Sequence, residues 1–407
     1  MSPTEAGIIG FLFLTILMFL KMPVGFVMAL VGFCGFGMLV SWDASLNLSA
    51  RDLFSVFSSY NLTVIPLFVF MGQCAFHSGI STRLFNAAHK FIGHLPGGLA
   101  MATIGACAAF AAICGSTSAT AATMASVTLP EMKKFNYDPS LATGVVAAGG
   151  SLGILIPPST IFIVYSIMTE QSIGKLFMAG VLPGILLSLL FILTILIWTL
   201  INPEVGPRGP KSTMKEKILS LSGLIETLIL FVLVMGGLFV GLFTPTEAAG
   251  IGALGTLVIA VLGKNLSWKD FLKTLDDTAR ITCMIMVIVA GATIFGHFLA
   301  VTRIPTDIGT WVGGLPMPSI MVMAIIILVY IFLGCLMDSL AMVMLTIPVF
   351  FPVVTTLGYD PIWFGVIIVL VAEIGVITPP VGINVYVVAG SPGTCPFTSS
   401  SKGLSGC

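Results

Sequence analysis

The sequence predicts an all-α polytopic membrane protein: an inverted-topology internal repeat with two re-entrant helical hairpins and two broken helices. Three observations lead to this fold class: an apolar composition, paired short helical arms in each half, and turn residues that recur at a fixed offset. Apolar residues make up 57% of the 407 residues and charged residues only 8%, whereas soluble domains carry about 25% charged residues. This composition excludes a soluble enzyme, and no basic run suggests nucleic-acid binding.

Apolar runs predict the helices of the first half, because a spanning helix needs about 20 apolar residues. Glu5 precedes the first run and Lys21 follows it, the reverse of a secretory signal peptide, so we expect a retained span. The stretch 81–95 is basic and amphipathic. The first repeat, residues 1–200, is expected to hold scaffold spans within 6–77 (6–20, 23–40 and 54–77), a hairpin at 97–130, a broken helix at 140–169 and a span at 176–200.

A polar, basic segment at 201–218 divides the chain and is expected to lie in the cytoplasm. The second repeat, residues 219–389, is expected to hold scaffold spans within 219–301 (219–242, 246–262 and 281–301), a hairpin at 316–352 and a broken helix at 361–389. The first repeat ends in a full span, whereas residues 390–407 are polar and cannot supply its counterpart. We expect this atypical tail to leave the last broken helix uncovered and the chain poorly active.

The hairpins are predicted from arms that are too short to cross a bilayer. The arms 97–113, 118–130, 319–334 and 339–352 would reach at most about 25 Å, less than the roughly 30 Å of hydrocarbon. Gly, Ser, Thr or Asp residues join the two arms of each pair. Such irregular backbone is tolerated at membrane depth only where protein or water satisfies it, so we expect each pair to re-enter.

Turn residues recur 222 positions apart. This offset carries Pro130 to Pro352, the tripeptide Tyr-Asp-Pro at 137–139 to the same tripeptide at 359–361, and the motif GILIPPST at 153–160 to GVITPPVG at 375–382. Several matches in one register over more than a hundred residues predict an internal duplication.

The distribution of basic residues predicts that the two copies have opposite topology. If Lys21 is cytoplasmic and the spans alternate, thirteen Lys and Arg residues before the tail lie inside, and only Arg51, Lys175 and Arg303 lie outside. This is a positive-inside bias. It predicts a multi-pass membrane protein with its N-terminus outside and its C-terminus in the cytoplasm; the family resemblance described below implies that the membrane is the bacterial inner membrane and that the outer side is the periplasm.

Each diproline break frees backbone carbonyl groups, because proline has no N–H and disrupts the preceding turn. Inverted repeats with discontinuous helices are typical of secondary transporters, whose sites form where half-helices meet. Freed carbonyls suit a hard cation such as Na⁺, and the hairpin tips add the side chains of Ser116, Thr117, Ser118, Asp338 and Ser339.

Ionisable residues inside apolar runs are costly and are treated as candidate functional groups. Asp338 at the second tip is a candidate for binding cation or substrate. Glu373 either faces the site or accepts hydrogen bonds from freed backbone N–H groups. Glu247 fits the first turn of a helix better than a site. Arg303 either attracts an anionic substrate or anchors at the interface.

The motifs CGSTSATAAT, GGSLGILIPPS, FTPTEAAG and ITPPVGIN resemble the large membrane subunit of the TRAP (tripartite ATP-independent periplasmic) transporters, over about residues 1–389. The resemblance implies elevator-type, Na⁺-driven uptake of an organic-acid anion, such as a dicarboxylate or a sialic-acid-like carboxylate. It also implies two partners: a small four-helix membrane subunit and a periplasmic substrate-binding protein.

The resemblance further implies specific site residues. It places one Na⁺ site at Cys114, Ser116 and Ser118 with Gly153, Ile156 and Pro157, and a second at Gly334, Gly375 and Thr378. Substrate candidates are Ser116, Thr117, Asp338, Ser339, Arg303 and Glu373.

Two other functions stay open: a stand-alone Na⁺-coupled carboxylate carrier of the same superfamily, and a non-transporting membrane assembly subunit. An intramembrane enzyme is not expected, because the spans carry no paired aspartates, Ser–His arrangement or H-E-x-x-H motif. The sequence does not identify the substrate, the Na⁺ stoichiometry or the oligomeric state.

Overall fold

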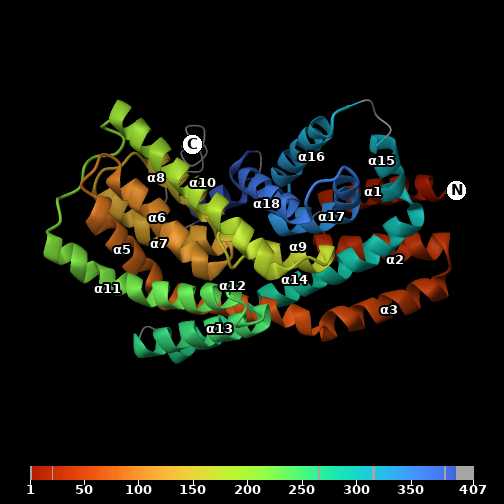
Figure 1. Cartoon of the computed structure of the whole chain (residues 1–407), viewed down its shortest axis with the longest axis horizontal. Helices are drawn as coiled ribbons and strands as arrows, with labels where there is room; N and C mark the ends of the chain where they lie inside the picture. The colour runs from red at the N-terminus through yellow and green to blue at the C-terminus, as the bar shows by residue number, and fades with distance from the viewer. Residues whose placement is uncertain (1, 21, 265, 314–316, 380–381, 391–407) are drawn as a thin grey trace.

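The computed structural model describes residues 2–20, 22–264, 266–313, 317–379 and 382–390. All regular secondary structure in these ranges is helical, and the helices form an elongated molecule (Figure 1). The predicted tail at 390–407 lies outside the described residues except for its first residue. The all-helical part of the predicted fold class is therefore confirmed for the described residues.

The first half contains ten α-helices and two short 3₁₀ turns. They are α1 (Pro3–Phe19), α2 (Val24–Leu39), α3 (Trp42–Ser58), η1 (Tyr60–Thr63), α4 (Val64–His77), α5 (Ile80–Ile92), α6 (Gly98–Cys114), α7 (Thr117–Lys134), α8 (Pro139–Ser151), η2 (Leu152–Ile154), α9 (Thr160–Thr169) and α10 (Ile173–Ile201).

The second half repeats much of this order, with one π-helical turn. Its elements are α11 (Met214–Phe231), η3 (Val232–Gly236), α12 (Gly237–Phe239), α13 (Pro245–Leu262), α14 (Trp268–Thr302), α15 (Ile304–Gly313), α16 (Ser319–Gly334), α17 (Ser339–Thr356), α18 (Pro361–Ile377) and α19 (Ile383–Ala389).

Helix bounds follow the 222-residue register. Adding 222 to the bounds of α7, 117–134, gives 339–356, which are the bounds of α17. The starts of α8 and α18, at 139 and 361, differ by the same number. Both helices start alike, because Asp138 and Asp360 cap them and a proline follows each. The register accounts for these bounds, and the opposite topology of the copies stays a prediction.

Within the described ranges, five helices are long and apolar enough to span a membrane: α10, the continuous run from α11 to α12, α13, α14 and α17. The bent pair of α3 with η1 and α4, at 49°, would add a sixth. The arm predicted at 339–352 continues to Thr356 and is one of these five, so the length argument for a re-entrant arm does not hold there. In contrast, α6 and α16 are shorter apolar helices, as predicted.

Two predicted spans have different bounds in the structure. The span predicted at 54–77 is divided, because the backbone is extended at Ser59 between α3 and η1. The span predicted at 281–301 is the second half of α14, which begins at Trp268 behind a capping box formed by Ser267 and Asp270. In both places helix continues into polar sequence that hydropathy assigned to loops.

The helices pack in two groups: one contains α2, α3, α4, α13 and α14, and the other contains α6–α9 and α16–α19. α2 lies against α14 and α3, while α4 lies against α13 and α14 (Figure 1). α6, α7 and α8 pack together, as do α16, α17 and α18. The predicted amphipathic stretch forms α5, which packs on α6 and is joined to α11 by the ion pair Arg83–Glu226, 2.8 Å between Nη2 and Oε2.

Candidate functional site

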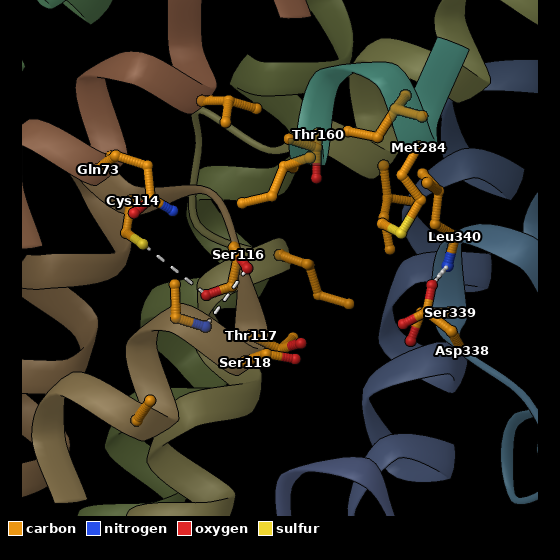
Figure 2. A pocket seen from close by; sticks show the side chains of 18 of the residues that line it. Gln73, Cys114, Ser116, Thr117, Ser118, Thr160, Met284, Asp338, Ser339 and Leu340 are labelled. Carbon is orange, nitrogen blue, oxygen red and sulfur yellow. Dashed lines mark hydrogen bonds between the residues drawn. The ribbon is translucent and has the colours of Figure 1, made fainter. Parts of the chain in front are cut away.

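A cavity of about 480 Å³ lies between the two loops that join α6 to α7 and α16 to α17. We call these loops, each with the last helical residue before it, the first tip (residues 114–118) and the second tip (residues 334–339). Residues of α4, η2, α9, α14 and α19 complete the wall. Figure 2 shows the two tips on opposite sides of the cavity. The site therefore draws on both halves of the chain.

The first tip is a tight turn held by backbone contacts. Gly115 has a left-handed backbone, φ 65°, and a Cβ there would lie 2.6 Å from the carbonyl oxygen of Pro158. Ser116 then caps α7, its Oγ accepting a hydrogen bond from the Ala119 N–H at 3.4 Å. The Thr160 hydroxyl donates to the Gly115 carbonyl at 3.1 Å. These contacts attach the tip to the second proline of the first diproline and to the start of α9.

The first break lies directly against this tip. α8 passes into η2, and the chain is then non-helical until Ser159 caps α9. A Cβ at Gly153 would lie 2.4 Å from the carbonyl oxygen of Ser116, so only glycine leaves room for that oxygen. The same carbonyl accepts a hydrogen bond from the Thr120 hydroxyl at 2.8 Å. Carbonyl and hydroxyl oxygens therefore gather between the tip and the break.

The second tip meets the second break through two glycines. A Cβ at Gly375 would lie 2.6 Å from the Cα of Gly334, so the two backbones touch. Asp338 caps α17, and its Oδ2 accepts a hydrogen bond from the Leu340 N–H at 3.0 Å. Thr378 ends α18 with an extended backbone, and its hydroxyl donates to the Ile374 carbonyl at 2.5 Å. Pro380 and Val381 lie outside the described residues.

The structure brings most of the sequence-predicted site residues together. Six of them line the cavity: Cys114, Ser116, Thr117, Ser118, Asp338 and Ser339. Gly153 lies against the first tip, and Gly334 and Gly375 lie together at the second. Ile156 and Pro157 are buried and do not line the cavity, and Ile156 packs towards Gly184 of α10 instead.

Two predicted candidates lie elsewhere. Arg303 is exposed at the end of α14 and does not line the cavity. Glu373 is only 2% exposed in α18, and neither carboxylate oxygen has a hydrogen-bond partner among the residues that the structure describes. Neither interpretation of Glu373 given above therefore accounts for its position. Glu247, by contrast, forms a capping box with Thr244, as its helix-start interpretation predicts.

Sequence reasoning missed the wall that α4, α9 and α14 contribute. Its polar members include Gln73 and Thr160, and Met284 and Ile285 lie on its apolar part. The only sequence signal was a single amide at position 73 within the apolar run of α4. Contacts between helices far apart in sequence decide which face of α4 meets the tips, and hydropathy does not report them.

The polar groups at the cavity are hydroxyls, backbone carbonyls, one carboxylate and one amide. Apolar side chains line the rest of the wall. Hard cations such as Na⁺ prefer oxygen ligands of this kind, whereas transition metals prefer His and Cys. Within the described ranges, no group of three or more His, Cys, Asp or Glu side chains is placed to hold a metal ion. The cavity thus combines oxygen ligands with an apolar surface.

Comparisons with known proteins agree on one family. The model of the tripartite ATP-independent periplasmic transporter, DctM component, matches residues 11–403. The chain is 37% identical over 357 residues, 88% of this chain and 83% of the other, to the C4-dicarboxylate TRAP transporter large permease protein DctM of Pseudomonas aeruginosa. It is 31% identical over 389 residues, 95% and 90% of the two chains, to the sialic acid TRAP transporter large permease protein SiaM of Vibrio cholerae.

A solved structure has a similar fold at low sequence identity. The YdaH transporter of Alcanivorax borkumensis superposes with a TM-score of 0.61 at 15% identity, covering 90% of this chain and 86% of its own. This likeness concerns the fold alone. The family match and the relatives above define the molecular class: a multi-pass membrane transporter rather than an enzyme. The chain belongs to the DctM family, the large membrane subunits of the tripartite ATP-independent periplasmic transporters.

Proposed function

We propose that this chain takes up an organic-acid anion, such as a dicarboxylate or a sialic-acid-like carboxylate, across the bacterial inner membrane by Na⁺ symport. The observation that carries the proposal is the single cavity formed by both tips, each of which contacts the helix break of its own half. Relatives named for C4-dicarboxylate and sialic acid transport support the substrate class.

Two cation positions follow from the two tip-and-break contacts. The first would use oxygens around Ser116 and Gly153, and the second would use backbone oxygens around Gly334 and Gly375 together with Thr378. The Thr378 hydroxyl hydrogen points to the Ile374 carbonyl, which leaves the hydroxyl oxygen free to face a cation. Bound Na⁺ would supply the positive charge that an anionic substrate needs beside Asp338.

The proposed transport cycle is of the elevator type. α6–α9 and α16–α19 would move as one body that carries both tips and both breaks, while α2–α4, α13 and α14 would remain as the scaffold, with α4 and α14 lining the cavity in this state. α19 packs on α7 and α8, and α17 packs on α9, which supports treating the two sets of helices as one body. The family's tripartite composition supports two partners, a small membrane subunit and a periplasmic substrate-binding protein, rather than a stand-alone carrier.

Replacing Na⁺ with K⁺ should abolish uptake, because K⁺ does not fit sites sized for Na⁺. The test is uptake of labelled succinate and labelled sialic acid in proteoliposomes that contain the chain, its small subunit and its binding protein, with the membrane potential held constant. We expect more than a tenfold loss of initial rate in K⁺. Equal rates in the two salts would contradict Na⁺ coupling.

The end of α7 should face the cytoplasm and the end of α17 the periplasm, because the basic residues favour opposite topology. Lys134 and Thr356 are exposed at these ends, 222 residues apart. In a cysteine-free background, Thr356→Cys should react with an impermeant thiol reagent on intact cells. Lys134→Cys should react only after lysis. The reverse pattern would overturn the proposed orientation.

A further inference from the structure

Gln73 is the one polar side chain that α4 places in the cavity wall. It lies in an otherwise apolar helix and is half-buried. Its side-chain amide has no hydrogen-bond partner among the described residues. The amide lines the cavity without being fully enclosed. Its N–H groups are therefore available to a ligand that enters the cavity.

Close packing fixes the position of Gln73 relative to the first tip. A Cβ on the neighbouring Gly72 would lie 2.7 Å from the carbonyl oxygen of Cys114, so α4 and the tip touch at their backbones. Figure 2 shows Gln73 beside Cys114, on the side of the cavity that carries Ser116 and across from Asp338 and Ser339. The amide is thus held at one defined end of the cavity.

The two ends of the cavity differ in charge. Asp338 places a carboxylate at the second tip, while the first tip and Gln73 offer neutral hydroxyl and amide groups. A substrate carboxylate is repelled by Asp338 and is attracted to N–H and O–H donors. A glutamine amide supplies two N–H donors without a charge that would trap the anion.

We infer that Gln73 is a substrate-binding residue that donates a hydrogen bond to a substrate carboxylate and so holds that carboxylate at the α4 end of the cavity. This inference rests on the proposed function. The inference adds to the proposed function the end of the cavity at which a substrate carboxylate lies and a residue that discriminates between organic acids. A hydrogen bond to a charged group accounts for a tenfold to hundredfold difference in affinity.

The test measures ligand stabilisation, in NaCl, of the chain purified with its small membrane subunit, with succinate and sialic acid as probes. We expect Gln73→Leu to raise the half-maximal concentration of the better probe at least tenfold. Gln73→Glu should raise it at least as much, because the new charge repels the anion. Gln73→Asn, which keeps the amide, should retain part of the affinity, and the ratio between the two probes should change in all three variants.

The matched control is Gln171→Leu, the same chemical change at a residue whose amide donates to the Thr169 carbonyl outside the cavity. It should leave both half-maximal concentrations unchanged. The half-maximal NaCl concentration without substrate should be the same in every variant, which separates substrate binding from a merely structural effect. Wild-type affinity in Gln73→Leu would overturn the inference alone. If neither probe stabilises the wild-type chain purified with its small membrane subunit, the proposed substrate class is overturned and this inference with it.

Discussion

Asp338→Asn should reduce Na⁺-dependent uptake roughly thirtyfold or more while leaving the fold intact. Asp338 is the acidic residue of the cavity wall. Loss of one interaction with a charged group costs about 2 kcal/mol of binding free energy, which corresponds to a roughly thirtyfold change. Asparagine caps a helix about as well as aspartate does. The bond from the Leu340 N–H can therefore persist, and α17 should stay in place. The measurement is initial uptake rate in proteoliposomes at several Na⁺ concentrations, with thermal unfolding of the same preparations.

Asp360→Asn is the matched control, since Asp360 caps α18 in the same way and lies outside the cavity. Its Oδ1 accepts hydrogen bonds from Ile362 and Trp363 at 2.9 and 2.8 Å. This variant should transport at close to the wild-type rate. Asp338→Glu keeps the charge and should recover part of the uptake. If Asp338→Asn and Asp360→Asn transport equally well, the Asp338 charge has no part in binding.

The sequence predicted best those features that local chemistry determines. An aspartate followed by a proline starts both α8 and α18, and the arm predicted at 339–352 matches α17 to within four residues. Glycine beside a diproline correctly indicated where each broken helix loses its regular backbone. Capping and proline effects act within one turn of helix, so they are visible in a single sequence.

Features that depend on long-range packing were not predictable. Hydropathy missed α3 and the first part of α14, because both carry polar residues on one side and are held by caps and neighbouring helices. Hydropathy also did not indicate that α4 and α14 would line the cavity. Nor did it indicate that the Glu373 carboxylate would be buried without a hydrogen-bond partner among the described residues. The apolar sequence of a helix does not determine which of its faces packs against which neighbouring helix.

Gly153→Ala and Gly375→Ala should each destabilise the protein by about 1–3 kcal/mol, the usual range for overpacking a dense interior. The new methyl carbon would lie 2.4 Å from the Ser116 carbonyl oxygen in the first variant and 2.6 Å from the Gly334 backbone in the second. Both neighbours are backbone atoms, which cannot rotate away as a side chain does. The tip must therefore separate from the break, and the oxygens proposed to bind Na⁺ would separate with it.

Gly105→Ala and Gly296→Ala provide matched controls, because a Cβ at either helical position meets nothing within 4 Å. Alanine favours helix over glycine by about 1 kcal/mol, so these variants should unfold at or slightly above the wild-type temperature. The measurement is thermal unfolding of the purified protein with and without NaCl. Saturating Na⁺ at a hundred times its dissociation constant should stabilise the wild type and both controls by about 2.7 kcal/mol for each occupied site. Gly153→Ala and Gly375→Ala should unfold several degrees lower and lose much of the Na⁺ effect. If both variants matched the controls in unfolding temperature and in stabilisation by Na⁺, the close contact between tip and break would be incidental to cation binding.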